Sequence, residues 1–126
     1  DHLHVSGLAN KFTESDATVA NAAKSVQQPL FGSRGPAYLA MPVYSSSQTI
    51  WQFAPTRKLL GNDDFIYCAG GGIMSHPGGA ADGVTSLREA AEAARLGLSL
   101  KEFAAPGSPL KRAMDHFDIP VINLST

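Results

Sequence analysis

A strand–loop–helix unit that occurs three times along the chain is the feature that most constrains its fold. Short apolar stretches at Leu3–Val5, Tyr38–Tyr44 and Phe65–Ala69 predict strands, and each is followed by a polar or glycine-containing loop. Each loop leads into a helical segment. Strands that alternate with helices form parallel sheets with helices packed against them. The sequence therefore predicts an α/β fold with parallel strands.

The helices show recognisable ends. Pro55 is expected in a first helical turn, Gly97 ends the clearest helix, and Ser99 with Glu102 forms a capping box. The strand at Phe65–Ala69 is apolar nearly throughout, as in a strand buried on both faces, so Cys68 is expected to be a small buried hydrophobe. The expected helices are Ser15 or Asp16 to Val26, Thr49 or Ala54 to Leu60, Gly83 to Leu96, a short helix after Ser99, and Pro109 to Phe117.

Three parallel strands would leave two open edges and much uncovered surface. The chain also opens on Asp1, not Met, and enters a strand directly. We therefore expect that further chain precedes Asp1 in the working protein.

Composition excludes several classes of protein. The chain has 126 residues and a formal net charge of −1, so no basic excess indicates nucleic acid. No apolar stretch approaches the roughly 20 residues that span a membrane, and no signal peptide is visible at the start. A single cysteine excludes an internal disulfide and fits a reducing compartment. We expect a cytoplasmic protein that binds neither nucleic acid nor membrane.

The loops after the strands carry the candidate chemistry, because active sites of parallel α/β barrels lie at the carboxyl ends of the strands. Gly70-Gly71-Gly72 directly follows the third strand and could present backbone N–H groups to a phosphate; a plain tight turn is the alternative. Ser45-Ser46-Ser47-Gln48 offers hydroxyls and an amide to a sugar, or forms a solvated loop. Lys11 lies on a glycine-containing loop that could fold over an anion, or is a surface lysine.

Two histidines on the first strand share a face because they stand two residues apart. With Asp1, His2 and His4 resemble part of a metal site, but no third ligand stands at suitable spacing. We therefore favour a substrate-contacting or hydrogen-bonded core histidine. His76 is expected to fix its loop by hydrogen bonds. Trp51 and Phe53 are expected to be packing residues.

Three motifs in this order resemble the C-terminal part of the Rubisco large subunit. They are His4 with Lys11 seven positions later, Pro42-Val43-Tyr44-Ser45, and Gly70-Gly71-Gly72 followed by His76-Pro77. The resemblance covers residues 1–96. It implies that residues 1–126 are a C-terminal fragment of a (β/α)8 TIM barrel, with about strands 6 to 8 and the following helices. The N-terminal domain and the early barrel strands would be absent.

The resemblance also implies roles for individual residues. His4 and Ser45 would contact the substrate. Lys11 would be the catalytic lysine of a mobile loop that closes over the substrate. Gly70 and Gly71 would bind a phosphate through their backbone N–H groups.

Departures from the carboxylases favour the Rubisco-like proteins, such as the oxo-isoapionate-phosphate decarboxylases. Carboxylases usually carry glycines where this chain has Ser46 and Ser47, and the second of these glycines donates its N–H to phosphate. Ser47 is therefore a predicted substrate-binding residue whose backbone geometry the substitution puts in doubt. The loop from Ser6 to Glu14 lacks the valines and glycines of carboxylases, and no tryptophan follows His76-Pro77.

The family's chemistry implies a Mg²⁺-stabilised enolate or enediolate formed from a phosphorylated sugar acid or keto sugar. Decarboxylation or isomerisation is the leading expectation, and ribulose-bisphosphate carboxylation is an alternative. The Mg²⁺ ligands are expected upstream of Asp1, and this chain supplies no metal ligand. A homodimer is expected at full length. A further alternative is an inert phosphate-binding fragment, since this piece alone would be inactive.

Overall fold

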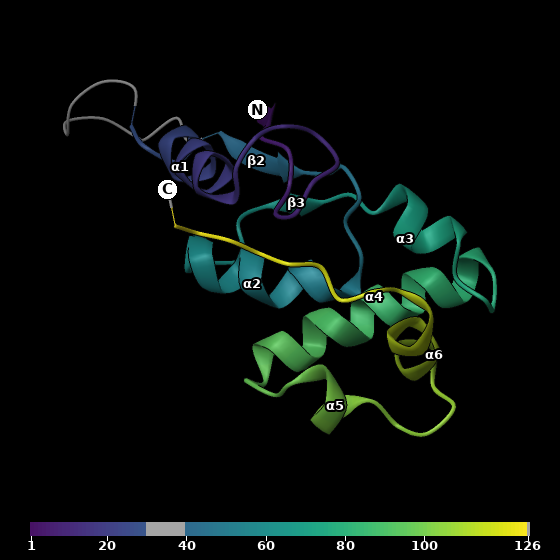
Figure 1. The fold of residues 1–126 in the computed structure, drawn as a ribbon. Coiled ribbons are helices and arrows are strands. Elements are labelled where there is room, and N and C mark those ends of the chain that lie inside the picture. Colours follow the sequence, from purple (N-terminus) through teal and green to yellow (C-terminus); the bar gives the residue numbers. More distant parts are fainter. Residues whose placement is uncertain (30–39, 126) are drawn as a thin grey trace.

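The fold is a small parallel sheet with helices on one side of it (Figure 1). The computed structural model describes residues 1–29 and 40–125. Strands β1 (His2–His4), β2 (Met41–Tyr44) and β3 (Ile66–Tyr67) are all parallel and lie in the order β1-β2-β3. The α/β class and the parallel strands are therefore confirmed for the described residues.

Six helices complete the described chain. Helix α2 lies between the sheet and a layer formed by α4 and α6 (Figure 1). Their bounds are α1 (Asp16–Val26), α2 (Ile50–Leu60), α3 (Gly70–Met74), α4 (Ala80–Arg95), α5 (Leu100–Phe103) and α6 (Pro109–His116).

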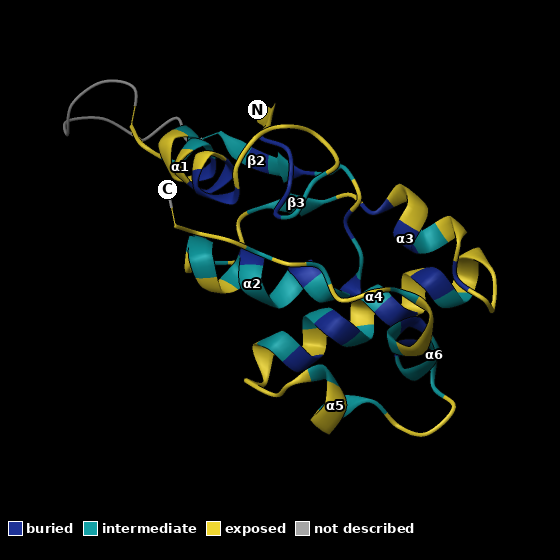
Figure 2. Ribbon diagram, in the orientation of Figure 1, coloured by how far each residue is buried: buried dark blue, intermediate teal, exposed yellow. Residues whose placement is uncertain are grey.

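The strand register separates the two faces of the sheet. Pro42 and Tyr44 point to the helices and are buried, and Tyr44 joins an apolar cluster with Leu8 and Val19. The opposite face carries His4, which pairs with Val43 in the register. Figure 2 shows buried segments concentrated where helices meet the sheet and one another. Only one face of the sheet is thus covered by the described residues.

This one-sided cover corrects two expectations. Phe65–Ala69 was expected to be buried on both faces, but β3 is only Ile66–Tyr67 and both residues are half-buried. Cys68 is exposed, not buried. Side chains alternate along a strand, so Cys68 follows Ile66 to the face that no described helix covers. The predicted second strand shortens to Met41–Tyr44; Tyr38 and Leu39 lie outside the described residues.

Helix α2 begins at the earlier of its two expected starts. Thr49 and Gln52 form a reciprocal capping box, in which the Thr49 N–H donates to Gln52 Oε1 at 3.0 Å. Pro55 therefore lies inside the helix, and the expectation of a first-turn position is wrong. A proline there leaves the carbonyl of Trp51 without its helical donor.

The later helices follow the sequence closely. Helix α4 starts at Ala80, three residues earlier than expected, and ends as predicted: the N–H groups of Gly97 and Leu98 donate to carbonyls in its last turn. The capping box at Ser99 and the helix from Pro109 are confirmed. His76 is buried and fixes its loop, because Nδ1 accepts from the Gly78 N–H and Nε2 donates to the Pro109 carbonyl, each at 2.9 Å.

The aromatic residues have the expected packing roles. Phe53 lies 5.5 Å from Phe65 and 5.2 Å from Tyr67, ring centroid to ring centroid. Trp51 packs on the cluster around Ile50 and donates its indole N–H to the Phe117 carbonyl at 2.8 Å. None of the helices in the described ranges is both long and apolar enough to cross a membrane.

We expect acid to weaken the α5 cap. The Ser99 hydroxyl and N–H hold the pKa of Glu102 below its ordinary value of 4.5. A depressed carboxyl pKa contributes stability above the ordinary pKa, and that contribution is lost as pH falls through the folded-state value. Glu102→Gln should therefore destabilise the protein at pH 7 and reduce its further loss of stability below about pH 4.5. Melting temperatures of both proteins from pH 7 to pH 3 test this; parallel curves would contradict it.

Candidate active site

His4 and Ser45 lie together at the carboxyl ends of neighbouring strands. His4 closes β1, and Ser45 follows β2; the His4 Nε2 is hydrogen-bonded to the Ser45 Oγ. The parallel register places His4 beside Val43, so the next residues along β2 reach the same edge. His4 is exposed, since none of the described residues covers its side chain. The pair can present one imidazole and one hydroxyl to a bound oxygen.

The loops after β1 and β2 are packed together through the buried side chain of Gln48. Its Nε2 donates to the carbonyls of Leu8 and Ser46, each at 2.9 Å. A Cβ at Gly7 would lie 2.2 Å from the Gln48 amide, so only glycine fits this approach. The amide of Gln48 is therefore engaged inside the protein and is not offered to a ligand.

The glycine-rich segment after β3 also packs against Gln48. A Cβ at Gly72 would lie 2.5 Å from the Gln48 carbonyl oxygen, so the third loop also abuts the second. Gly70 and Gly71 are the first residues of α3 and are exposed, with open space where a Cβ would stand. The first N–H groups of a helix have no acceptor within it. These two N–H groups can therefore face a ligand at the strand ends.

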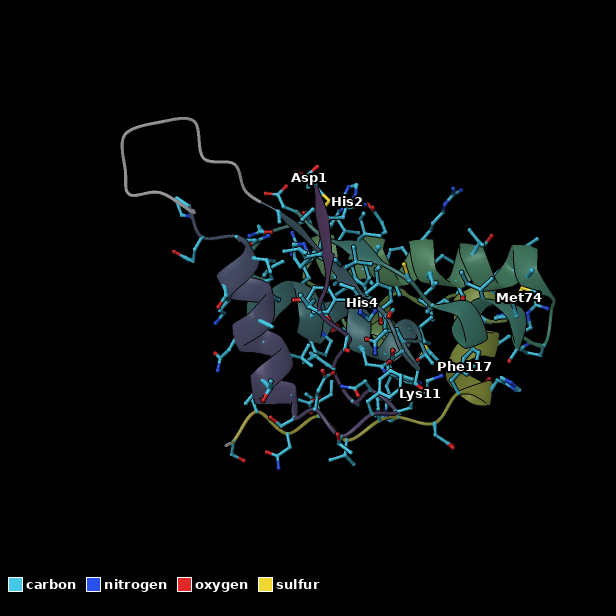
Figure 3. The ribbon with its side chains drawn as sticks, turned by 90° about the horizontal axis from the view of Figure 1, so that it is seen from above. Asp1, His2, His4, Lys11, Met74 and Phe117 are labelled. Carbon is cyan, nitrogen blue, oxygen red and sulfur yellow. The ribbon has the colours of Figure 1, made fainter. Side chains whose placement is uncertain are left out.

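Lys11 lies on the first loop, beyond the end of β1 (Figure 3). It is exposed, its Nζ lies 5.5 Å from the centroid of the Phe12 ring, and it forms no ion pair with the described residues. Asn10 shapes the loop: its Nδ2 donates to the Gly7 carbonyl, and its Oδ1 accepts from the Phe12 N–H, both at 2.8 Å. Among the described residues, Lys11 forms no hydrogen bond with His4 or Ser45.

Backbone strain gathers in the first two loops. Within residues 1–29 and 40–125, the non-glycine residues with positive φ are Ser6 at 60°, Ala9 at 47°, Ser46 at 70° and Ser47 at 59°. Each L-residue in this region costs about 1–2 kcal/mol, and such strain clusters at functional sites. Ser46 and Ser47 thus keep a backbone that favours glycine, although both carry side chains, and Ser47 is exposed.

Two tyrosines support the strand ends from the helix side. Burial raises the pKa of Tyr44 to about 12 and raises the pKa of Tyr67 as well. The Tyr67 hydroxyl donates to the Thr49 carbonyl at 2.7 Å, at the start of α2. Both phenols therefore remain neutral near physiological pH and act as packing groups.

Two buried polar residues at the site were not identified from the sequence. The sequence predicted that Gln48 contacts a sugar or lies in a solvated loop, and that Asp16 stands at the start of a helix. Ser15 is the cap of α1, and Asp16 instead accepts the Ala9 N–H at 2.5 Å. Gln48 and Asp16 each bond a residue of the loop after β1, which lies outside their own element. A local sequence pattern therefore does not predict these bonds. Gly7 and Gly72 were the available signals of close packing.

Two hollows among the described residues lie away from these loops. One, of about 350 Å³, is at the opposite ends of the strands and includes Gln27, Met41 and Asn62. The other, of about 340 Å³, lies between α2 and the end of α4, beside Arg57 and Leu98. Neither hollow is lined by the residues at the carboxyl ends of the strands, His4, Ser45 and Gly70, which we call the rim.

The described residues do not fit a resident metal. No three His, Cys, Asp or Glu side chains come together in residues 1–29 and 40–125. His2 and His4 share a strand, but Asp1 does not complete a ligand set with them. The described residues alone therefore form no such metal site.

Comparisons with known proteins agree with this architecture. A family model described as ribulose bisphosphate carboxylase large chain, catalytic domain, matches residues 1–117. The chain is 46% identical to a 3-oxo-isoapionate-4-phosphate transcarboxylase/hydrolase of Xanthobacter autotrophicus, over 90% of this chain and 27% of that protein. It is 34% identical to a 3-oxo-isoapionate-4-phosphate decarboxylase of Rhizobium etli, over 93% of this chain and 28% of that protein.

A solved structure supports the same relationship. The crystal structure of a Rubisco-like protein from Burkholderia fungorum matches with a TM-score of 0.88 and 38% identity, over 93% of this chain and 28% of that one. The chain thus spans little more than a quarter of the length of these relatives. By sequence and by fold, it belongs to the ribulose bisphosphate carboxylase large-chain family.

Proposed function

We propose that this chain forms the phosphate-binding rim of a Rubisco-like enzyme that generates an enolate or enediolate from a phosphorylated sugar acid or keto sugar. The observation that carries the proposal is the His4–Ser45 contact. It lies at the same strand ends as the open N–H groups of Gly70 and Gly71. An imidazole, a hydroxyl and backbone donors together suit a substrate that carries hydroxyls and a phosphate.

We place the three strands as the last three of a (β/α)8 barrel. The uncovered face of the sheet supports this placement. In a barrel, this inner face is enclosed by the remaining strands, which are not among those of this chain. Active sites of such barrels lie at the carboxyl ends of the strands, where His4, Ser45 and Gly70 are found. In this arrangement, residues 1–126 are the end of the catalytic domain and the other strands come from the rest of a full-length protein.

Each of these residues then has a defined role. Gly70 and Gly71 bind a substrate phosphate through N–H groups at the start of α3, and the Ser47 N–H adds a donor. His4 and Ser45 orient a substrate oxygen. Lys11 moves with its loop over the bound substrate, and its ammonium stabilises negative charge as it develops on the substrate.

In this proposal, Mg²⁺ is bound by residues outside this chain. A bound Mg²⁺ would polarise the substrate oxygens and so ease proton removal. The residues described here do not hold it, and their tasks are binding, orientation and charge stabilisation. At full length we propose a cytoplasmic homodimer, while this chain by itself would be inactive.

Decarboxylation of a 3-oxo sugar-acid phosphate is the leading reaction. Relatives named for 3-oxo-isoapionate 4-phosphate match nine-tenths or more of this chain. The test is carbon dioxide release from this compound by the full-length protein with Mg²⁺. Carboxylation of ribulose 1,5-bisphosphate in place of that reaction would favour a carboxylase. No turnover of either compound would favour a phosphate-binding role.

Lys11→Ala should lower kcat in the full-length enzyme by about 10²-fold or more, because one charge-stabilising donor is lost. Lys24→Ala is the matched control: Lys24 is an exposed lysine in the last turn of α1, and its loss should leave kcat unchanged. Steady-state rates of the two variants decide the question. An undiminished rate for Lys11→Ala would remove this lysine from the mechanism.

Ser47→Gly should raise the free energy of unfolding by about 1 kcal/mol, since glycine adopts positive φ without steric cost. It should keep the Ser47 N–H in place and so preserve substrate binding. Ser25→Gly, in the right-handed backbone of α1, should instead destabilise by about 0.5 kcal/mol. Denaturant unfolding gives both values, and equal signs for the two variants would contradict the strain argument.

A further inference from the structure

The peptide group between Leu8 and Ala9 is held on both sides by side chains from other elements. Its carbonyl accepts from Gln48 Nε2 at 2.9 Å, and its N–H donates to Asp16 Oδ1 at 2.5 Å. We propose that Gln48 and Asp16 are positioning residues for Lys11, because they fix the base of the loop that carries it. This inference rests on the proposed catalytic role of Lys11.

Burial makes this clamp strong. Gln48 is 1% exposed and Asp16 is 8% exposed, while the Leu8 side chain is fully buried in the apolar cluster beside β2. Hydrogen bonds gain strength away from water, and a carboxylate acceptor strengthens the bond from Ala9 further. Beyond Ala9, residues 11–15 are exposed. The buried anchor of the loop therefore ends at Ala9, and beyond it Asn10 bonds Gly7 and Phe12 on either side of Lys11.

Gln48 also sets the spacing between the two loops of the site. The same Nε2 donates to the Ser46 carbonyl, so one amide nitrogen holds both loops. Its Oε1 is buried and has no partner among the described residues. The amide lies so close to Gly7 that a Cβ there would be 2.2 Å from it. A carboxylate in place of this amide would face two carbonyl oxygens and repel both.

Asp16 extends the clamp to the end of the chain. Its Oδ2 accepts the Asn123 N–H at 2.6 Å, and Ile122 packs against the same apolar cluster as Leu8. The terminal segment crosses α2 to reach α1 (Figure 1). One carboxylate thus bonds the Lys11 loop and the terminal segment at once. Loss of either oxygen should loosen Ala9.

Amide hydrogen exchange in the full-length protein tests the clamp without any substrate. Gln48→Met and Asp16→Asn should each make the amides of residues 9–12 exchange about tenfold faster, because local opening becomes easier. Gln27→Met and Asp82→Asn are matched controls, since Gln27 bonds Asp64 and Asp82 bonds Arg112 at a distance from the loop. If Gln48→Met fails to fold, Asp16→Asn decides the test, because it leaves Gln48 and its two hydrogen bonds in place. Unchanged exchange at residues 9–12 would overturn the clamp.

Kinetics then separate positioning from general stability. Gln48→Met should lower kcat about tenfold with a smaller change in KM, since a misplaced charge weakens transition-state stabilisation. In a Lys11→Ala background the same substitution should cause no further loss. Equal losses in both backgrounds would show that Gln48 does not act through Lys11. If the parent protein turns over neither test compound, the proposed function fails, while the exchange result still decides the clamp.

Discussion

Gln48 lies between the loops that follow β1 and β2, and its carbonyl oxygen faces Gly72 at the start of α3. Three segments far apart in the sequence therefore meet around one buried residue. Strand pairing alone aligns the strand ends but does not fix the loops beyond them. Close packing does so here, because the contacts at Gly7 and Gly72 leave no space even for a methyl group. The positions of Ser45 and Gly70 both depend on this junction.

The low net charge also bears on how this rim could bind an anion. The chain carries ten Lys and Arg and eleven Asp and Glu residues, so its overall field does not attract phosphate. Of the basic residues in the described ranges, Arg57, Arg95, Lys111 and Arg112 each form an ion pair with a carboxylate. Under the proposed function, attraction of a phosphate to the strand ends would come from oriented N–H groups and from Lys11. The direction of a backbone N–H group is set by the fold. The loop junction around Gln48 therefore orients these donors as well as holding the loops together.

Local patterns in the sequence were sufficient for much of the fold. The capping box at Ser99 and the helix stop at Gly97 each depend on neighbours within a few residues, and both were correctly predicted. Burial was harder, since it depends on what covers each face: Cys68 follows an apolar run yet is exposed. The role of Gln48 could not be predicted either, because its partner Leu8 lies forty residues away. The family motifs located His4 and Ser45, whose contact is also long-range.

Ser46 and Ser47 show how residues other than glycine can be held in a strained backbone conformation. Their carbonyls are each held by a buried glutamine: Gln48 Nε2 donates to Ser46 at 2.9 Å, and Gln52 Nε2 donates to Ser47 at 3.0 Å. Strained conformations persist when the surroundings over-determine them. These bonds do not depend on the side chain at either position, so glycine can be replaced at a cost in stability but without a change of backbone course. The hydroxyls then become available at the rim, where Ser45 already meets His4.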